Sequence, residues 1–435
     1  MVTVKVNTKK AVSRMKPMHG GGEPPVVANA SDCFFHYLTE AGIPYSRLHD
    51  VGGAFGRNLY VDIPNIFRNF DADVDDPASY DFTFTDLLLN QLIKAGVEPY
   101  YRLGVTIENA FHIKHYTISP PKDFDKWGKI CEHIMAHYLE GWADGFHHKI
   151  TYWEIWNEPD YYIGGNWQGT EEEFYRLYDT AAQWIKKRFP YVKIGGYGHA
   201  SGLYTAVDLP NPFHGPNDDF YKDKWQEEFF IDFMKYAVEH NTPFDFFTWH
   251  GYGPTTHNKK VAPWIRAKLD EFGFTDTELH LNEWDPYWNE FGTEHHSAEI
   301  AAMTIAMQNA PVDVCCIYDM RTVDAPFCPL FNPITHKPHH GYYSFVAFNH
   351  LYKLGTQVAA DSGAEELYAL AASDGRKNAL MISNLTGEAQ ELDLQGVDLS
   401  DAYIYVIDQD RLLSWAPNAD RIEKNMVLLI EWLEK

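Results

Sequence analysis

Two glutamates follow short β-prone runs and could act as a pair. The first, Glu158, lies in the sequence WEIWNEP at 153–159. Pro159 cannot donate to a sheet ladder, so we expect the strand to stop there and leave the Glu158 carboxyl at its C-terminal end. Asn157 beside it carries an amide suited to a sugar hydroxyl. The alternative interpretation of Glu158 is a carboxylate that caps a loop.

The second glutamate, Glu283, ends the run ELHLNE. Two carboxyl groups across a cleft suit glycosidic cleavage, because one protonates the leaving oxygen while the other attacks the anomeric carbon. We therefore predict Glu158 as general acid/base and Glu283 as nucleophile. A covalent route needs the two groups about 5–5.5 Å apart, whereas inversion needs roughly 6.5–9.5 Å. The alternative for Glu283 is a surface or salt-bridged side chain.

Further polar residues lie at other predicted strand ends and are candidates for the same site. Arg47 and His49 share one side of their strand, and His250 and Tyr252 share one side of theirs. Arg47 could keep Glu283 ionised, because a nearby cation lowers the pKa of a carboxyl group. The Tyr252 hydroxyl could orient Glu283. For each of these four residues, a structural hydrogen bond at the rim is the alternative.

Glu154 lies on the same face of its strand as Glu158 but deeper. We expect this carboxylate to be a buried structural group with a cationic or donor partner.

The chain is rich in aromatic residues, which make up 15% of it. Flat rings stack on the apolar faces of sugars, although most rings in any chain serve as core residues. We predict that Trp284 and Tyr318 bind the sugar, with Trp167 and Trp288 as further candidates for a sugar platform.

The elements that must position these residues alternate between strands and helices. A closed parallel barrel requires eight strands, each followed by a helix. The Gly20-Gly21-Gly22 run is followed by Glu23 and two prolines, so it lacks the helix start of a dinucleotide-binding turn, which disfavours a doubly wound sheet. Predicted strands lie near 13–19, 44–49, 97–103, 150–156, 192–197, 244–250, 278–283 and 312–318. Predicted helices lie near 31–41, 83–95, 123–140, 171–188, 225–240, 259–272, 294–309 and 340–353.

The pattern changes after about residue 355, where β-like runs alternate with turns and no long helical pattern intervenes. The fold class is therefore α/β, a (β/α)8 TIM barrel with a small C-terminal antiparallel β-sandwich domain. We assign residues 10–353 to the barrel and residues 354–435, with 1–9, to the accessory domain.

Composition excludes several partners. The formal charge of −25 repels nucleic acid and anionic lipid. The five cysteines form no CxxC pair, and the His147-His148, His295-His296 and His339-His340 doublets lack metal-ligand spacing, so neither a metal nor another cofactor is predicted. The first residues carry no apolar signal segment, so we expect a soluble protein, cytoplasmic or, if a signal peptide was removed before residue 1, periplasmic or secreted. The oligomeric state stays open.

At these motifs the sequence resembles clan A glycoside hydrolases, and most closely glycoside hydrolase family 39. Glu283 falls where the nucleophile of that family falls. The resemblance implies a β-linked glycosidic bond cleaved with retention, by double displacement through a covalent glycosyl-enzyme, and no metal. The segments that carry it are 46–49, 153–159, 169–178, 193–196 and 246–252.

The sugar stays open. β-Xylosidase is the best-known activity of the family, but its members have a Trp-rich eighth strand followed by acidic residues, whereas this chain has Tyr318-Asp319-Met320-Arg321. Part of the 19–24 stretch also differs from the family. We therefore expect an oligosaccharide or polysaccharide substrate, β-xyloside-like or another plant or microbial glycan. The alternatives are a non-catalytic carbohydrate-binding barrel and, less favoured because it lacks a nucleotide fingerprint, an oxidoreductase.

Overall fold

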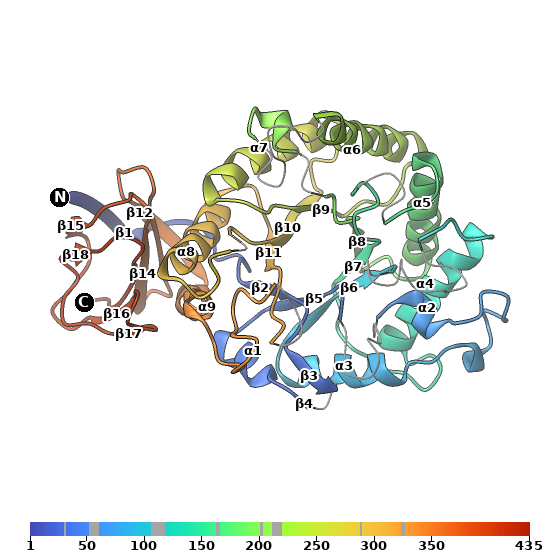
Figure 1. Ribbon diagram of the computed structural model, residues 1–435, viewed down its shortest axis with the longest axis horizontal. Coiled ribbons are helices and arrows are strands. Elements are labelled where there is room, and N and C mark those ends of the chain that lie inside the picture. Colours follow the sequence, from blue (N-terminus) through green and yellow to red (C-terminus); the bar gives the residue numbers. More distant parts are fainter. Residues whose placement is uncertain are drawn as a thin grey trace.

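Eight parallel strands close into a barrel in the order β10-β11-β2-β5-β6-β7-β8-β9 (Figure 1). The computed structural model describes residues 1–29, 32–51, 61–105, 118–161, 166–200, 203–210, 220–287, 289–322 and 327–435. The barrel strands are β2 (Gly20–Gly22), β5 (Tyr45–Leu48), β6 (Glu98–Leu103), β7 (Tyr152–Ile155), β8 (Lys193–Gly195), β9 (Phe246–His250), β10 (Glu278–Trp284) and β11 (Val314–Ile317). The predicted fold class is confirmed.

The first barrel strand differs from its prediction. Residues 13–19 do not form it, because β1 (Val2–Arg14) continues in the other sheet until Arg14 pairs with Thr356. The glycine run predicted as a loop is itself the strand, β2. A Cβ atom on Gly20 would lie 2.6 Å from the Cys315 carbonyl oxygen, and one on Gly21 would lie 2.1 Å from Met320 Sδ. Only glycine allows this close approach, and a glycine run has no period-2 pattern to reveal a strand.

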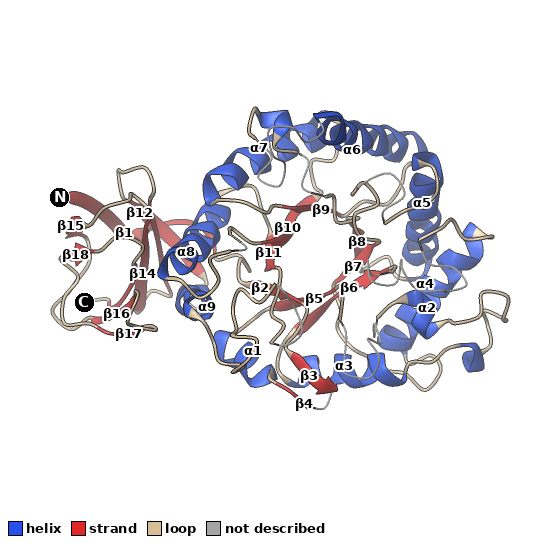
Figure 2. Ribbon diagram, viewed as in Figure 1, coloured by secondary structure: helices blue, strands red, loops and turns tan. Residues whose placement is uncertain are grey.

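Helices form a ring around the strands (Figure 2). The helix α5 shows why they begin where they do: Thr170 and Glu173 form a capping box, three glutamates lie in the first turn, and basic residues lie in the last. The helices are α1 (Phe35–Ala41), α2 (Ile63–Ile66), α3 (Thr83–Lys94), α4 (Phe124–Glu140), α5 (Glu171–Arg188), α6 (Phe220–His240), α7 (Thr255–Glu271), α8 (Glu294–Asn309) and α9 (His340–Tyr352), with short 3₁₀ turns at Pro77–Ser79 and Thr205–Val207.

Side chains fill the barrel interior in layers, as strand alternation requires. The N-terminal end is mainly apolar and aromatic, with Tyr100, Tyr152, Phe246, Val314 and Cys316 in one buried cluster. The next polar layer holds Arg47, Glu154, Thr248 and Asn282 in hydrogen-bond contact. The two glutamates singled out in the sequence lie above it, at the C-terminal end of the strands, where barrels carry their active sites.

A second, nine-stranded sheet packs beside α8 and α9, and both chain termini lie on this side (Figure 1). It curls around its own apolar core while its other face joins the barrel core. It is antiparallel except where β1 pairs with β15. Its strands are β1, β12 (Thr356–Asp361), β13 (Leu367–Ser373), β14 (Lys377–Asn384), β15 (Gln390–Gln395), β16 (Tyr403–Ile407), β17 (Ser414–Trp415), β18 (Arg421–Ile422) and β19 (Val427–Leu433).

A separate two-stranded sheet pairs β3 (Val26–Asn29) with β4 (Asp32–Cys33). No described helix combines the length and the apolar composition that crossing a bilayer requires.

Candidate active site

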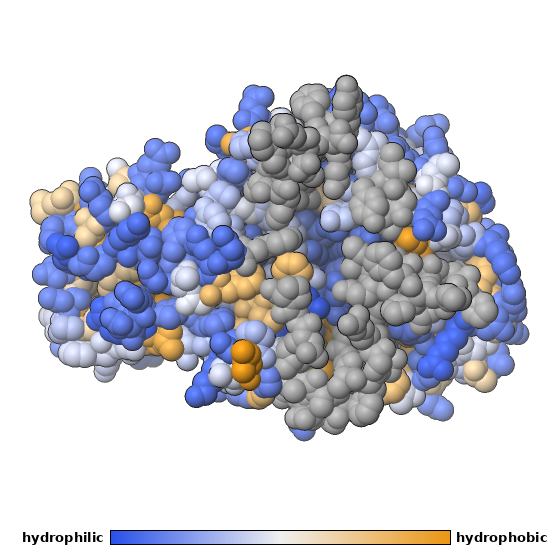
Figure 3. Space-filling view, in the orientation of Figure 1, coloured by the Kyte–Doolittle hydropathy of each residue, from blue (hydrophilic) through white to orange (hydrophobic). Residues whose placement is uncertain are grey.

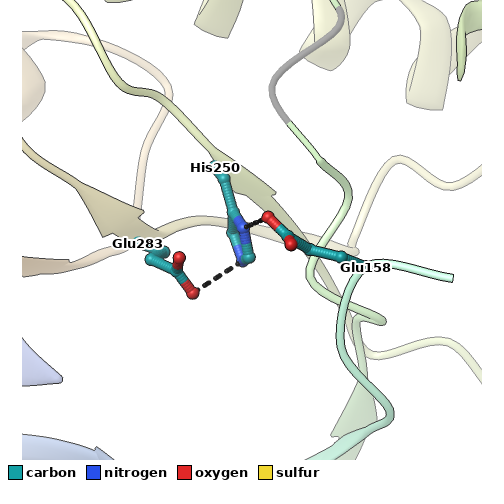
Figure 4. Close-up of side chains that lie close together, drawn as sticks. All are labelled: Glu158, His250 and Glu283. Carbon is teal, nitrogen blue, oxygen red and sulfur yellow. Dashed lines mark hydrogen bonds and ion pairs between the residues drawn. The ribbon is translucent and has the colours of Figure 1, made fainter. Parts of the chain in front are cut away.

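Glu158 and Glu283 converge on His250 at the C-terminal mouth of the barrel (Figure 4). One carboxylate oxygen of each glutamate and one ring nitrogen of His250 all lie within 4.8 Å of one another. His250 Nδ1 lies 2.6 Å from Glu158 Oε1, and His250 Nε2 lies 3.4 Å from Glu283 Oε2. The three residues come from β9, from β10 and from just beyond the end of β7. In the hollow near the centre of this face, the described surface that is visible is mainly hydrophilic (Figure 3).

The backbone beyond β7 directs Glu158 into the mouth. Trp156 and Glu158 have φ values of 78° and 47°, in the left-handed region that non-glycine residues rarely adopt. The Glu158 N–H donates to the carbonyl oxygens of Tyr197 and Gly198, each at 2.9 Å. Such strained residues gather at functional sites, where the surrounding structure holds them in place. Here the neighbouring strand end supplies that support.

Gly198 allows its neighbours to reach the site. Its φ of 57° favours glycine, and an added Cβ atom would lie 2.9 Å from both Asn157 Oδ1 and His250 Nε2. The backbone of this strand end therefore forms part of the wall of the site.

Glu283 is held by a cation and a hydroxyl group. Arg47 Nη1 donates to Glu283 Oε2 at 2.9 Å, and the Tyr252 hydroxyl donates to Glu283 Oε1. Both donors favour the ionised carboxylate, and both oxygens are oriented by a neighbour.

Arg47 connects three strands of the barrel. Besides Glu283, its Nε donates to Glu154 at 2.7 Å and its Nη2 donates to Asn157 Oδ1 at 2.7 Å. Glu154 is fully buried, and its other oxygen accepts from Thr248 and Asn282. The expectation that Glu154 has cationic and donor partners is thus met, and Glu154 anchors the guanidinium that orients Glu283.

Burial dominates the electrostatics of the site. It raises the pKa of Glu283 above its ordinary value, although His250, Arg47 and Tyr252 oppose the rise while Glu158 adds to it. Burial also lowers the pKa of His250 to about 4, so the imidazole is neutral near pH 7. A neutral imidazole has one N–H and one acceptor nitrogen, so it can donate to only one of the two glutamates.

The three convergent side chains are also of the types that bind metal ions. A zinc ion lies about 2.0–2.2 Å from its nitrogen and oxygen ligands and prefers tetrahedral angles. The 2.6 Å separation of His250 Nδ1 and Glu158 Oε1 is too short for a tetrahedral ion between them and suits a hydrogen bond. The geometry of this pair therefore favours proton chemistry.

Two other predicted residues also lie at this mouth. The Tyr318 ring centroid lies 6.2 Å from that of Tyr252, and its hydroxyl donates to Asp50 Oδ2 at 3.2 Å. His49 is buried, with Nε2 3.3 Å from Asp50 Oδ1. Asn157 accepts from Arg47 through Oδ1, as described above.

Trp284 requires a correction. Its side chain is fully buried in the hydrophobic core, with its ring 6.3 Å from that of Phe345 on α9. Beyond the bulge in β10, Glu283 faces the barrel interior and Trp284 packs on the outer side of the strand, away from the sugar site. Trp167 packs against Trp156 with its indole N–H bonded to the Thr170 carbonyl oxygen, so it is no open platform either. Trp288 lies outside the described residues.

The sequence interpretation assigned no role to four charged residues near the site, Glu23, Asp50, Asp319 and Arg321, although it noted that 19–24 and 318–321 depart from the family. Glu23 and Asp319 both contact Arg321, whereas Asp50 contacts Tyr318. All four residues lie just beyond the ends of the barrel strands β2, β5 and β11, and this position is the signal that could have identified them. The signal from Glu23 was lost because the preceding glycines were interpreted as a loop.

The barrel and the opposed glutamates at its mouth are typical of (β/α)8 glycosidases. The model of the family described as Glycosyl hydrolases family 39 matches residues 39–374, most of the chain. The chain therefore belongs to this family, as the sequence motifs predicted.

The curated relatives agree with this placement. The chain is 22% identical over 276 residues to a β-xylosidase of Geobacillus stearothermophilus, which covers 57% of this chain and 49% of the relative. It is 27% identical over 225 residues to a β-xylosidase of Caldicellulosiruptor saccharolyticus, covering 49% and 37%. The matched regions thus span half or less of these enzymes.

Among solved structures, a glucosidase from Croceicoccus marinus has a TM-score of 0.78 at 21% identity, covering 99% of this chain and 98% of that one. The GH39 enzyme from Xanthomonas axonopodis pv. citri has a TM-score of 0.69 at 15% identity, covering 99% and 97%. At these identities the two structures bear on the fold alone.

Proposed function

We propose that the protein is a retaining glycoside hydrolase that cleaves a β-linked glycosidic bond, with Glu283 as nucleophile and Glu158 as general acid/base. The observation that carries this proposal is the approach of the two carboxyl groups, whose oxygens lie within 4.8 Å of each other. This spacing suits the roughly 5–5.5 Å of covalent catalysis and is shorter than the roughly 6.5–9.5 Å that admits a water molecule for inversion.

The surroundings of the two carboxyl groups support the division of roles. Glu283 accepts from Arg47 and Tyr252, which stabilise its ionised form despite its burial. Glu158 contacts the neutral imidazole of His250. The acceptor nitrogen of this ring can accept a hydrogen bond from a protonated Glu158. When two carboxyl groups have such different surroundings, one of them can be protonated while the other is ionised.

In the first step, a Glu283 oxygen forms a bond to the anomeric carbon while the bond from that carbon to the leaving oxygen breaks. The Glu158 proton passes to the leaving oxygen, and Glu158 becomes a carboxylate. In the second step, Glu158 takes a proton from a water molecule whose oxygen bonds to the anomeric carbon. The bond to Glu283 breaks, the sugar leaves with its configuration retained, and both glutamates return to their first state.

The substrate follows from the family only as a class, a carbohydrate. The two curated relatives named above are β-xylosidases, so aryl β-xylosides are the first substrates to test. The strand-end sequence 318–321 shapes the sugar pocket, and this stretch departs from that of the family.

A panel of aryl β-glycosides, with β-xyloside and β-glucoside first, tests the proposal. We expect turnover of at least one of them, and proton NMR of the earliest product should show the β-anomer before mutarotation. An α-anomer as first product would contradict retention. Oligosaccharide binding without cleavage of any substrate would favour a non-catalytic carbohydrate-binding barrel instead.

A further inference from the structure

A group of buried charged residues lies beside the catalytic glutamates and takes no part in the two steps above. It consists of Glu23, Asp319 and Arg321, and we call it the Arg321 cluster. The side chains of Glu23 and Asp319 are 1% and 0% exposed, and that of Arg321 is 20% exposed. Arg321 Nε lies 2.5 Å from Glu23 Oε2, and Arg321 Nη2 lies 2.7 Å from Asp319 Oδ2.

Backbone hydrogen bonds fix the Arg321 cluster at the mouth of the barrel. The Glu23 N–H donates to the Arg47 carbonyl oxygen, and the Met320 N–H donates to the Gly22 carbonyl oxygen, both at 2.9 Å. Glu23 therefore stands at the level of Arg47, the residue that holds Glu283.

A chain of contacts links the cluster to the nucleophile. Arg321 Nη2 donates to the Tyr318 hydroxyl at 3.2 Å, the Tyr318 ring packs against Tyr252, and Tyr252 donates to Glu283. The cluster thus occupies the β11–β2 side of the mouth, next to β10, whereas Glu158 follows β7 on the far side.

Glu23 and the proposed acid, Glu158, share an unusual backbone conformation. Glu23 has a φ of 48° and directly follows β2, and Glu158 has a φ of 47° and lies shortly beyond the end of β7. Asp50 also follows its strand with a φ of 53°. A left-handed conformation costs free energy at residues other than glycine and persists at functional sites. Three acidic side chains at the barrel mouth share this cost.

Glu23 has an unused acceptor. Its Oε1 atom is buried and has no hydrogen-bond partner among the described residues. A buried carboxyl oxygen without a donor is costly, so a bound group with an O–H would stabilise it. Sugar hydroxyl groups are such donors.

Charge favours a neutral sugar over an acidic one. Two carboxyl groups of the cluster share a single guanidinium group, and Asp50 lies nearby. His49, which contacts Asp50, supplies no second cation at neutral pH, because burial and neighbouring arginines depress the pKa of its imidazole. The Nε and Nη2 donors of Arg321 are already engaged. Burial raises the pKa of both Glu23 and Asp319, so this region already opposes negative charge, and the charge of a uronate would be unfavourable here too.

We propose that Glu23, supported by Arg321 and Asp319, accepts a hydrogen bond from a ring hydroxyl of a neutral sugar bound at the nucleophile, and so determines which sugar is cleaved. This inference rests on the proposed function. Glu23 is then a substrate-binding residue, and Arg321 and Asp319 are positioning residues that act through it.

The inference is tested by measuring the effect of one substitution on a series of substrates. The parent substrate is the aryl β-glycoside that the wild type cleaves best, compared with analogues that each lack one hydroxyl group other than that at carbon 2. We expect Glu23→Gln to lower kcat/KM for the parent by about 5- to 10-fold, the effect of losing one hydrogen bond. For the analogue that lacks the hydroxyl bound by Glu23, the substitution should change kcat/KM less than about 3-fold.

A matched control is Glu299→Gln. Glu299 is also a buried carboxyl group, bonded to Thr255 on the outer helices. We expect any effect of this substitution to be equal for all substrates in the series. If Glu23→Gln also lowers kcat/KM by the same factor for every analogue, or leaves the parent unchanged, the inference is overturned.

A second measurement uses the wild type alone, so it tests the inference even if the Glu23→Gln protein does not fold. The wild type should cleave the aryl β-glucuronide at least about 100-fold less efficiently than the β-glucoside or β-xyloside, whichever is the better substrate. Efficient glucuronide cleavage would overturn the inference and leave the proposed hydrolase intact. Absence of turnover on the whole panel would instead reject the proposed function.

Discussion

The Nδ1 atom of His250 lies 2.6 Å from Oε1 of Glu158, while the other ring nitrogen faces Glu283. The tautomer that suits both neighbours carries its proton on Nε2, towards the ionised nucleophile, and leaves Nδ1 as an acceptor for a protonated Glu158. A hydrogen bond to the neutral form of a carboxyl group raises its pKa.

The first prediction concerns this acceptor. His250→Phe removes this acceptor, so it should destabilise the protonated form of Glu158 and move the basic limb of the kcat/KM profile to lower pH. The loss should be largest for substrates with poor leaving groups, which depend most on the acid. A pH profile with two leaving groups checks this. His280→Phe, at the opposite end of the barrel, is the control, and a basic limb that moves to higher pH would show that Nδ1 donates instead.

The second prediction concerns the Tyr252 hydroxyl. Its hydrogen bond lowers the pKa of Glu283, so Tyr252→Phe should raise that pKa further above its ordinary value. Because the nucleophile must be ionised, the acid limb of kcat/KM should then move to higher pH. We expect kcat/KM to fall about 10- to 100-fold.

Tyr138→Phe is the matched control, since Tyr138 donates to Asp86 far from the mouth. The assignment of Tyr252 fails if both variants show the wild-type acid limb.

The third prediction concerns stability. Arg47 is 1% exposed and pairs with two glutamates, so Arg47→Met leaves uncompensated buried carboxyl groups. Removing one partner of a buried ion pair costs about 3–5 kcal/mol of unfolding free energy. The double variant Arg47→Met with Glu154→Gln should recover part of that loss in urea unfolding.

An exposed pair gives the comparison. Arg421 and Glu391 are about half exposed, so Arg421→Met should cost less than about 1 kcal/mol. Equal losses for Arg47→Met and Arg421→Met would contradict the structural role of Arg47.

The fourth prediction concerns the acid/base. Glu158→Ala should retain activity mainly on substrates with good leaving groups, because these need no proton in the first step. Added azide fits the space left by the carboxyl group and should speed the second step, giving a glycosyl azide of retained configuration. With Glu283→Ala, any azide product should have the inverted configuration. The same configuration from both variants would contradict the assigned roles.

Local sequence signals predicted the elements and many of the residues of the site. The runs that lead to Glu158 and contain Glu283 are clearly β-prone, and Glu154 has the cationic and donor partners expected of it. The Trp284 prediction was wrong because that ring packs outward against α9, and the local pattern does not reveal the bulge in β10 that brings both Asn282 and Glu283 into the barrel. The resemblance to family 39 came from the same short segments.

Contacts between distant segments were less accessible. The bonds from Arg47 to Glu154 and from His250 to Glu158 join residues about a hundred positions apart, and no spacing rule encodes them. The strand β2 was missed because glycines have no side-chain pattern, and Glu23 was missed with it. Sequence interpretation thus found Glu158 and Glu283 but assigned no role to Glu23, Asp50 or Asp319, although the strands before the last two were predicted.

The most direct test of the account is to trap the covalent intermediate. The wild type is treated with a 2-deoxy-2-fluoro β-glycoside of the best substrate sugar and an activated leaving group, and its peptides are analysed by mass spectrometry. The account predicts one fluoroglycosyl group per chain, attached to Glu283, and no labelling of the Glu283→Gln variant. A label on Glu158 or on any other residue would contradict it.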